Sequence, residues 1–208
     1  MVKLTGPLGS AKATGAFGGT AVFSSWKGRS YAKTKTTPFN PNSPMQVSVR
    51  ATMAFLASQW SVLSDAAKAT WTAAAAAAQI PPYNQFISAN LGRWSELHAP
   101  SQRDPPTETG TLPELDTFWL KGGPAHVEIS VDWYNRYDAW GLVIFRSTSS
   151  GFAPALNNAI ALVPLTADTG LIYNDQGLAP ARYYYNFRSF TTLGKLSAKL
   201  GQQTAVAT

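Results

Sequence analysis

Short apolar segments in the second half of the chain restrict its fold more than any other feature of the sequence. Within residues 126–133, apolar and polar residues alternate with a period of two, as in a strand that has one buried face. Glycine, proline, asparagine and aspartate separate this segment from others of similar length. Such a series predicts an antiparallel sandwich of roughly seven strands, placed at residues 114–201. The segments expected to form strands are 115–120, 126–133, 141–146, 159–163, 170–173, 183–190 and 195–200.

Three groups of residues in this region resemble the fibronectin type III-like branch of the immunoglobulin-like sandwiches. They are Val131-x-Trp133, Leu142-Val-Ile-Phe-Arg146 and Leu178-Ala-Pro180-Ala-Arg-Tyr-Tyr184, which lie in or before three of the expected strands. In the third group the resemblance implies a tyrosine corner, in which Tyr184 buries its ring and bonds its hydroxyl group to nearby backbone. It also implies a rigid display or spacer module without chemistry of its own, because a sandwich fold does not fix a function.

Residues 43–98 are expected to form a small bundle of about three helices. Ser43 is the expected cap of the first helix, with Pro44 at the first helical position and Gln46 completing a capping box. Further signals are Ser64 as cap and Asp65 at the dipole of a second helix, and Asn84 near the start of a third, which Gly92 could break.

Apolar residues at spacings of three and four indicate which faces of these helices are buried. A bundle of this size has a marginal core, so we expect it to gain stability from the N-terminal segment. The residues expected to face the core are Met45, Val49, Met53, Leu56, Trp60 and Leu63 in the first helix, Ala67, Trp71, Ala74 and Ala78 in the second, and Phe86, Ile87, Leu91, Trp94 and Leu97 in the third.

Residues 1–42 are expected to form an extended, glycine-rich basic arm and a β-ribbon. Segments 20–26 and 29–36 have the pattern of two strands, and Lys27-Gly28 can form the turn between them. A two-stranded ribbon is marginally stable in water, so we expect it to pack on the helices or on another subunit, or to assemble by strand addition. The residues predicted to mediate assembly are Val22, Phe23, Trp26, Lys27, Arg29, Tyr31, Lys33 and Lys35.

Positive charge is concentrated at the N-terminal end. The net charge is +6, and Lys and Arg residues occur from Lys3 onward, whereas the first acidic residue is Asp65. Such an arm can face nucleic acid or an acidic partner surface. Lysines that only keep a polar, glycine-rich arm soluble would give the same pattern.

The predicted fold class is α+β with two domains: an N-terminal arm, β-ribbon and small helical bundle, followed by an all-β fibronectin type III-like sandwich. A proline- and threonine-rich stretch at 99–113 is expected to be a semi-rigid linker between them. Residues 202–208 are expected to form a polar tail. No apolar run approaches the roughly 20 residues that cross a bilayer, and the N-terminal residues do not have the apolar core of a secretory signal.

Residue types that carry catalysis are few and scattered, so no catalytic, metal or cofactor site is predicted. There is no cysteine, and neither His98 nor His126 has neighbours at the spacing of metal ligands. Glu128, Asp132 and Asp138 would have to converge to cleave a glycosidic bond, but a strand puts the first two on a solvent face. Asp168 and Asp175 are expected to be turn residues.

Aromatic residues near 133–140 offer a second kind of candidate site. Trp133 is expected in the core, whereas Tyr134, Tyr137 and Trp140 are expected in or near a loop at one end of the sandwich. Rings on a loop can stack on sugars or enter a partner subunit, although packing within the loop is the more frequent outcome.

Two resemblances concern the N-terminal half. The segment Trp60-Ser-Val-Leu-Ser-Asp-Ala-Ala-Lys-Ala-Thr-Trp71 is similar to part of the HMG boxes, which implies DNA binding. A wider pattern resembles uncharacterised proteins of bacterial and phage genomes, and it implies no chemistry. It consists of Val22-Phe-x-x-Trp26-Lys-Gly28, Pro38-x-Asn40-Pro41-x-Ser43-x-x-Gln46, Arg50, Phe55 and Trp60-x-x-Leu63-Ser64.

The sequence therefore leads to the hypothesis of a non-enzymatic structural subunit of a phage-like virion or similar assembly, made in a host cytoplasm. Its N-terminal half would join copies of itself and other structural proteins, and its sandwich would be displayed. No membrane partner is expected, and the basic arm could contact nucleic acid. Two alternatives are a DNA-associated protein that uses the basic arm and the HMG-like helices, and a surface glycan-binding protein that uses Tyr134, Tyr137 and Trp140.

Overall fold

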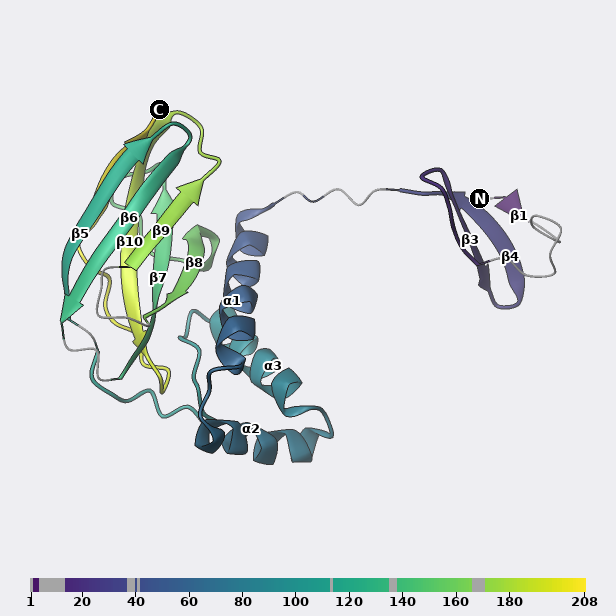
Figure 1. Ribbon diagram of the computed structural model, residues 1–208, viewed down its shortest axis with the longest axis horizontal. Helices are drawn as coiled ribbons and strands as arrows, with labels where there is room; N and C mark the ends of the chain where they lie inside the picture. Colours follow the sequence, from purple (N-terminus) through teal and green to yellow (C-terminus); the bar gives the residue numbers. More distant parts are fainter. Residues whose placement is uncertain are drawn as a thin grey trace. The chain divides into compact units, whose positions relative to one another are not determined.

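The computed structural model describes residues 2–3, 14–36, 40, 42–112, 114–134, 138–165 and 171–208. The chain is an α+β protein that forms two compact units, Met1–Pro41 and Asn42–Thr208 (Figure 1). The helices thus belong to the same unit as the sandwich, and the division falls between the N-terminal sheet and the first helix.

The N-terminal unit contains a four-stranded antiparallel sheet in the order β1-β4-β3-β2. The predicted ribbon is confirmed as β3 and β4, and the turn residues Lys27 and Gly28 have φ angles of 49° and 76°. Positive φ at both positions suits the twist of a two-residue hairpin. Two short strands from the expected arm flank the ribbon. The bounds are β1 (Val2–Lys3), β2 (Gly15–Phe17), β3 (Ala21–Trp26) and β4 (Arg29–Thr34).

Three helices follow, and their predicted starts agree well with the structure. The Ser43 backbone N–H donates to Gln46 Oε1 at 3.3 Å, and Ser64 Oγ accepts from the Ala67 N–H at 3.2 Å. The third helix begins slightly before Asn84 and continues through Gly92. The bounds are α1 (Pro44–Trp60), α2 (Asp65–Ala78) and α3 (Pro82–Ser95).

The buried face of α1 differs from the prediction. Met45, Val49 and Met53 are exposed, whereas the polar residues Ser48 and Gln59 are buried. Burial of these polar groups is tolerated because indole groups bond to them: Trp94 Nε1 donates to Ser48 Oγ, and Trp140 Nε1 donates to Gln59 Oε1, both at 2.9 Å. The buried residues of the helices are Ser48, Thr52, Phe55, Leu56 and Gln59 in α1, Ala67, Trp71 and Ala75 in α2, and Phe86, Ile87, Asn90 and Trp94 in α3.

Among the other residues expected to face the helical core, Leu63 is buried as predicted. Four are only half-buried, namely Trp60, Ala74, Leu91 and Leu97, and Ala78 is exposed.

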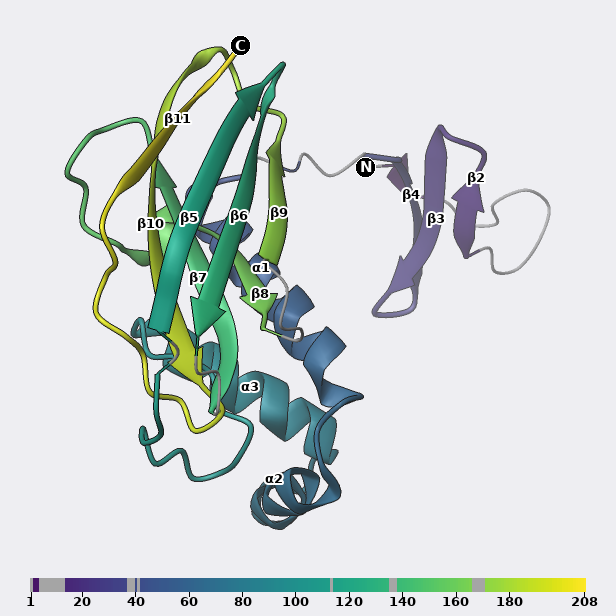
Figure 2. The same ribbon diagram turned by 60° about the vertical axis from the view of Figure 1, so that its left-hand side comes forward.

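Seven strands then form two antiparallel sheets, in the orders β5-β6-β9 and β11-β10-β7-β8 (Figure 2). The alternation predicted for β6 is confirmed, because Val127, Ile129 and Val131 point into a core shared with Tyr185 and Phe187 of the other sheet. The bounds are β5 (Glu114–Gly123), β6 (His126–Tyr134), β7 (Ala139–Ser147), β8 (Ala159–Pro164), β9 (Leu171–Gln176), β10 (Ala181–Thr191) and β11 (Gln203–Ala207).

The last strand lies further along the chain than predicted. Residues 195–200 contribute only an isolated bridge between Phe190 and Leu196, and the expected tail contains β11. β11 pairs with β10, and Thr208, the residue after β11, donates its N–H to the Gly123 carbonyl and accepts the Ala125 N–H. β11 therefore bonds to both sheets, and its small residues Ala205 and Ala207 are buried there.

A second core joins the helices to the outer face of the larger sheet. It contains Phe55 of α1, Val143 and Phe145 of β7 and Phe190 of β10. β10 consequently has buried residues on both faces, because Tyr185 and Phe187 lie in the core between the sheets and Phe190 lies in the core with the helices. The helices and the sandwich thus share buried contacts instead of forming separate cores.

The expected linker is packed between the helices and the sandwich within its described part, 99–112. Asn90 Oδ1 accepts from the Ser101 N–H at 2.6 Å, and Trp71 Nε1 donates to the Gln102 carbonyl at 2.6 Å. The Gln102 N–H in turn donates to the Thr192 carbonyl at 2.8 Å. The segment is therefore fixed by hydrogen bonds and does not act as a spacer.

The tyrosine corner is formed by the neighbour of the predicted residue. Tyr183 is buried, and its hydroxyl group donates to the Ala179 carbonyl at 3.0 Å. Tyr184 is half-buried on the opposite face of β10. The prediction was wrong by one position, which exchanges the two faces of a strand.

Candidate partner-binding surface

Strand register divides the N-terminal sheet into two faces of different chemistry. Residues directly opposite in an antiparallel pair share a face, and Trp26 is paired with Arg29, Ser24 with Tyr31 and Val22 with Lys33. We call this side the cationic face. Of the residues predicted to mediate assembly, the cationic face brings together Val22, Trp26, Arg29, Tyr31 and Lys33.

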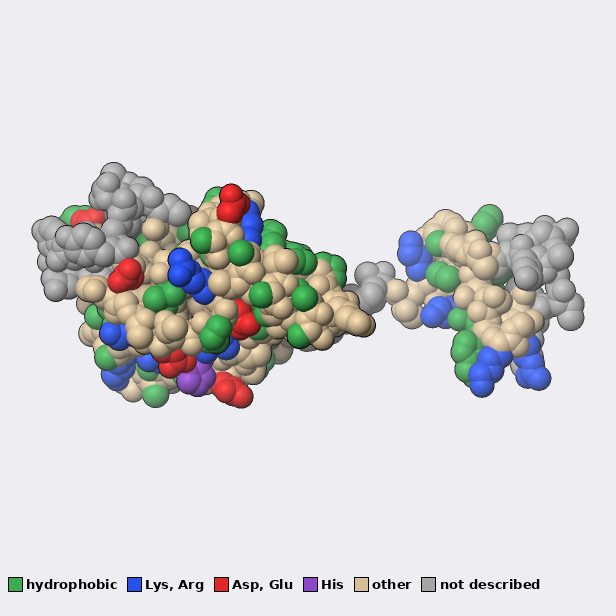
Figure 3. All heavy atoms as spheres, turned by 90° about the horizontal axis from the view of Figure 1, so that it is seen from below, with side chains coloured by type: hydrophobic (Ala, Val, Ile, Leu, Met, Phe, Trp, Pro, Cys, Tyr) green, Lys and Arg blue, Asp and Glu red, His purple; other side chains and the backbone are tan. Residues whose placement is uncertain are grey.

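Both an aromatic surface and positive charge are accessible on the cationic face. Trp26 is 66% exposed, and Lys27 in the turn places its Nζ 4.7 Å from the indole centroid, a cation–π distance. Lys35, another residue predicted to mediate assembly, follows β4 and donates its backbone N–H to the Thr20 carbonyl. Figure 3 shows Lys and Arg side chains of this unit beside hydrophobic ones, with no acidic side chain, as the sequence requires.

The opposite side, which we call the apolar face, contains Phe17, Ala21, Phe23 and Ala32, together with the polar residues Ser25, Ser30 and Thr34. Phe17 is paired with Ala21, and Phe23 with Ala32, so these four residues lie together. Phe17 is 62% exposed. Phe23 was predicted as a site residue, whereas Phe17 was missed because residues 1–20 were expected to be an arm. The alternation of 15–17 before a glycine-containing turn could have indicated a third strand.

The sheet has neither a second layer nor fully paired edges within its described residues. None of the described residues of 14–36 is buried. Their outer strands are short, since β2 pairs over three residues and β1 over two. A single sheet of this kind has no face covered by a layer of its own unit, and its short edge strands have backbone groups with which a partner strand can pair.

The aromatic candidates near 133–140 do not form a surface site as predicted. Trp140 is 3% exposed, with ring centroids 5.0 Å from Phe55 and 5.9 Å from Phe190. Its indole is held by Gln59, so Trp140 belongs to the core between helices and sandwich, and its prediction as a binding residue was wrong. Tyr137 and the side chains of Trp133 and Tyr134 lie outside the described residues.

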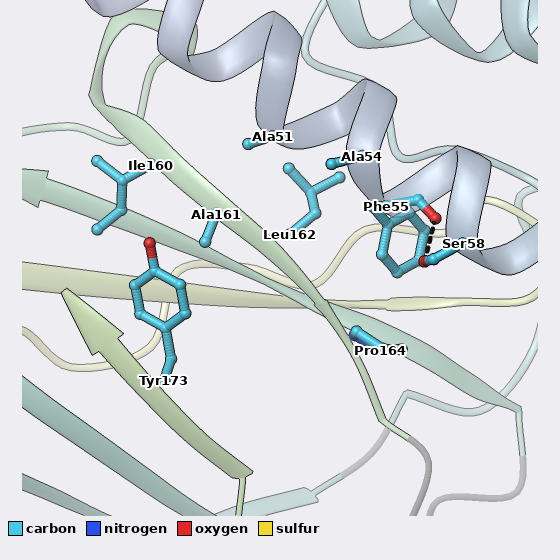
Figure 4. Close-up of a pocket in the computed structure, with 9 residues that line it drawn as sticks. All are labelled: Ala51, Ala54, Phe55, Ser58, Ile160, Ala161, Leu162, Pro164 and Tyr173. Atoms are coloured by element: carbon cyan, nitrogen blue, oxygen red, sulfur yellow. Dashed lines mark hydrogen bonds between the residues drawn. The ribbon is translucent and has the colours of Figure 1, made fainter. Parts of the chain in front are cut away.

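A groove of about 350 Å³ lies between α1 and β8 (Figure 4). Its lining is mainly apolar, with Ala51 and Ala54 from α1 and Leu162 from β8. Ser58 at its border donates its hydroxyl group to the Phe55 carbonyl at 2.7 Å, and Tyr173 contributes a phenol. Among the described residues of the lining there is no carboxylate, imidazole or ammonium group, and the Tyr173 phenol is the one titratable group.

Asp175 and Asp138 have structural partners. Asp175 is buried in β9 and is not the predicted turn residue: Arg146 Nη1 lies 2.6 Å from its Oδ1, and the Tyr185 hydroxyl donates to its Oδ2 at 2.8 Å. Burial raises the pKa of Tyr185 well above its ordinary value, and the Asp175 charge adds to the rise. Asp138 accepts the Thr111 N–H at 2.7 Å.

Neither histidine is placed as a metal ligand. His98 Nδ1 lies 3.3 Å from Glu108 Oε1, and His126 Nδ1 lies 2.9 Å from the Pro124 carbonyl oxygen. Arg93 donates to Glu108 at 2.9 Å and thereby lowers the pKa of this exposed carboxyl group, an effect to which His98 adds. Across the described residues, no group of three or more His, Asp or Glu side chains could hold a metal ion. Asp168 lies outside them.

Comparisons with known proteins give distant likenesses to parts of larger proteins. No family model and no curated protein matches the chain. A β-1,2-glucanase from Parabacteroides distasonis matches with a TM-score of 0.34 and 15% identity over 47% of this chain and 14% of the other. The FN1–FN3 domains of chicken CNTN1 match with a TM-score of 0.34 and 17% identity over 46% and 33%.

A third match is smaller and is covered almost completely. The PKD domain of an M14-like peptidase from Thermoplasmatales archaeon SCGC AB-540-F20 has a TM-score of 0.33 and 9% identity, over 48% of this chain and 98% of that domain. The chain spans well under half the length of the glucanase and of the CNTN1 fragment. The neighbours thus include immunoglobulin-like sandwiches at low coverage. Among the described residues, none of the helices has the length and apolar character needed to span a bilayer.

Proposed function

We propose that this chain is a non-enzymatic structural subunit of a phage-like virion or similar assembly. Its N-terminal sheet joins it to copies of itself and to other structural proteins through the apolar face. Its second unit, which includes a fibronectin type III-like sandwich, is a display or spacer body. The site of action is the virion, and the chain is made in the host cytoplasm.

One observation carries this proposal: the N-terminal sheet has no interior of its own among the described residues. The apolar face exposes Phe17, and Phe23 on the same face is only half-buried. A sheet normally needs one face covered by another layer to be stable in water. Docking of the apolar face on a second molecule would supply that layer, with roughly 25 cal/mol gained per Å² of apolar surface removed from water.

The second unit supports the proposed display role because it has its own interior. One core lies between its two sheets, and another lies between the larger sheet and the helices. The order of three strands facing four supports the finer description as a fibronectin type III-like sandwich, together with the tyrosine corner at Tyr183. A rigid body of this kind can project from an assembly without contributing to its contacts.

Self-association of the full chain tests the assembly role. We expect light scattering to show oligomers whose size increases with concentration, and Phe23→Ser to shift the equilibrium toward the monomer. Trp119→Ser is the matched control, because Trp119 is 61% exposed but lies on β5. A chain that remains monomeric at all concentrations, or a control that behaves like Phe23→Ser, would overturn this role.

The virion assignment requires a separate measurement. Particles purified from producing cells should contain the chain in a fixed ratio to the main structural protein, as measured by quantitative mass spectrometry. Recovery of the chain only outside particles would remove the assignment, even if the chain self-associates.

A further inference from the structure

We infer that the cationic face of the N-terminal sheet binds single-stranded nucleic acid, with bases stacking on Trp26 and Tyr31 and phosphates contacting the surrounding Lys and Arg side chains. This partner goes beyond the proposed assembly role. It uses the opposite face of the sheet, so that either proposal can fail without the other.

Two aromatic rings lie among cations on one accessible surface. On β4 the alternate residues Arg29, Tyr31 and Lys33 share the cationic face. Tyr31 therefore has a cationic residue on each side along the strand, at a Cα–Cα separation of roughly 7 Å. Trp26, on β3, lies directly opposite Arg29 of β4. Aromatic rings that alternate with cations on one face of a sheet are suited to bases and phosphates that alternate along an unpaired strand.

The turn extends this arrangement at the end of the sheet. Lys27 Nζ lies over the Trp26 ring at 4.7 Å, so an ammonium group already accompanies the indole. Trp26 nevertheless remains 66% exposed, which leaves area for a base to stack. A phosphate next to that base would then lie close to Lys27, because consecutive bases and phosphates are covalently linked.

The charged side chains of residues 1–64 all have the same sign. Acidic residues begin only at Asp65, so no carboxylate of the sheet competes with a phosphate for Arg29, Lys33 or Lys35. Uniform positive charge speeds the approach of a polyanion and makes its affinity depend on salt.

The two rings, of which Trp26 is 66% exposed and Tyr31 is half-buried, distinguish a nucleic acid strand from other polyanions. An acidic protein surface would need the cations alone, and a duplex keeps its bases stacked on one another. A single strand uses both the rings and the cations, and each base stacked on a ring contributes to affinity. The observations therefore favour an unpaired strand, of either DNA or RNA.

Binding can be measured on the full chain by fluorescence anisotropy with labelled oligothymidylate and oligouridylate, at several salt concentrations. A duplex of the same length and polyglutamate serve as competitors. We expect Trp26→Leu and Tyr31→Leu to weaken binding by about 5- to 150-fold each. Tyr31→Phe should retain most of the affinity, because it keeps the ring. Lys33→Gln should make the negative slope of log affinity against log salt shallower by about 0.7, because one fewer phosphate is neutralised.

Matched controls separate this site from the rest of the chain. Trp119→Leu removes an exposed indole from the second unit and should leave binding unchanged. Phe23→Ser tests the other face, and it should reduce self-association without removing the salt-dependent binding of each monomer.

Several results would overturn the inference. One is the absence of binding by the native chain at low salt. Another is equal competition by polyglutamate or duplex, which would assign the face to an acidic protein or to double-stranded DNA. A third is equal affinity of Tyr31→Leu and Tyr31→Phe, since base stacking requires the ring. The relative affinities for the two oligonucleotides decide between DNA and RNA.

Discussion

Replacement of Trp140 by alanine should destabilise the helices and the sandwich together. Trp140 is 3% exposed, packs edge-on against Phe55 and Phe190, and donates a hydrogen bond of 2.9 Å to Gln59 Oε1. Loss of such a side chain leaves a cavity and costs about 3–5 kcal/mol. About 1–3 kcal/mol of that loss would come from the buried Gln59 oxygen left without its donor. For a unit of this size the melting temperature should fall by roughly 6–20 °C.

Denaturant unfolding followed by two signals would measure this effect. Circular dichroism reports the helices and near-ultraviolet absorbance reports the aromatic core, and both should give the same lowered midpoint in Trp140→Ala. Trp140→Phe keeps most of the ring contacts and should lose only about 1–3 kcal/mol. Trp119→Ala, at an exposed position, should remain within about 0.5 kcal/mol of the native chain. Unchanged helix unfolding in Trp140→Ala would refute the shared core.

Three further predictions concern the sandwich. Tyr183→Phe should cost about 1 kcal/mol in denaturant unfolding because it removes the bond to Ala179, whereas a loss confined to Tyr184→Phe would contradict the assigned corner. Gly122→Ala should destabilise the fold by about 1–3 kcal/mol, because a Cβ at this position would meet the Val206 carbonyl of β11. Gly201→Ala, with open space around it, should leave stability unchanged. Equal melting temperatures of the two variants would place β11 elsewhere. Burial raises the pKa values of Tyr173 and Tyr185, so their contribution to the stability of the fold is complete below about pH 10 and is lost as pH rises above it. Phenolate absorbance should show these two residues ionising only as the fold is lost. Ionisation in the folded protein would contradict their burial.

Local signals in the sequence predicted the starts of elements well. The capping pattern at Ser43 and Gln46 and the turn at Lys27-Gly28 each depend on a few neighbouring residues, and the structure has both. Strand alternation was equally reliable over the described side chains of 126–132, because a strand with one buried face has a period of two.

Features decided by distant partners could not be predicted in the same way. Burial of Ser48 and Gln59 depends on indole donors 46 and 81 residues away, and these contacts turn the Met45 side of α1 outward. Asp175 is buried for the same reason, because Arg146 and Tyr185 come to it from other strands. The second core, which places Trp140 inside, also exists only once the helices meet the sheet.

The candidate surface was predicted in part. The turn at Lys27-Gly28 sets the register, and this register places Trp26, Arg29 and Lys33 on one side. The separation of Phe23 from them follows from the same alternation, but the sequence prediction grouped all of these residues together. Phe17 was missed because its strand is short and lies between glycines.

Hydrogen exchange of the backbone amides in β3 and β4 tests most directly whether another molecule completes the N-terminal sheet. In dilute, monomeric chain these amides should exchange rapidly, while those of β7 and β10 stay protected within the buried cores. On assembly, β3 and β4 should become protected to a similar degree. Slow exchange of β3 and β4 in the dilute monomer, unchanged on assembly, would contradict the proposal.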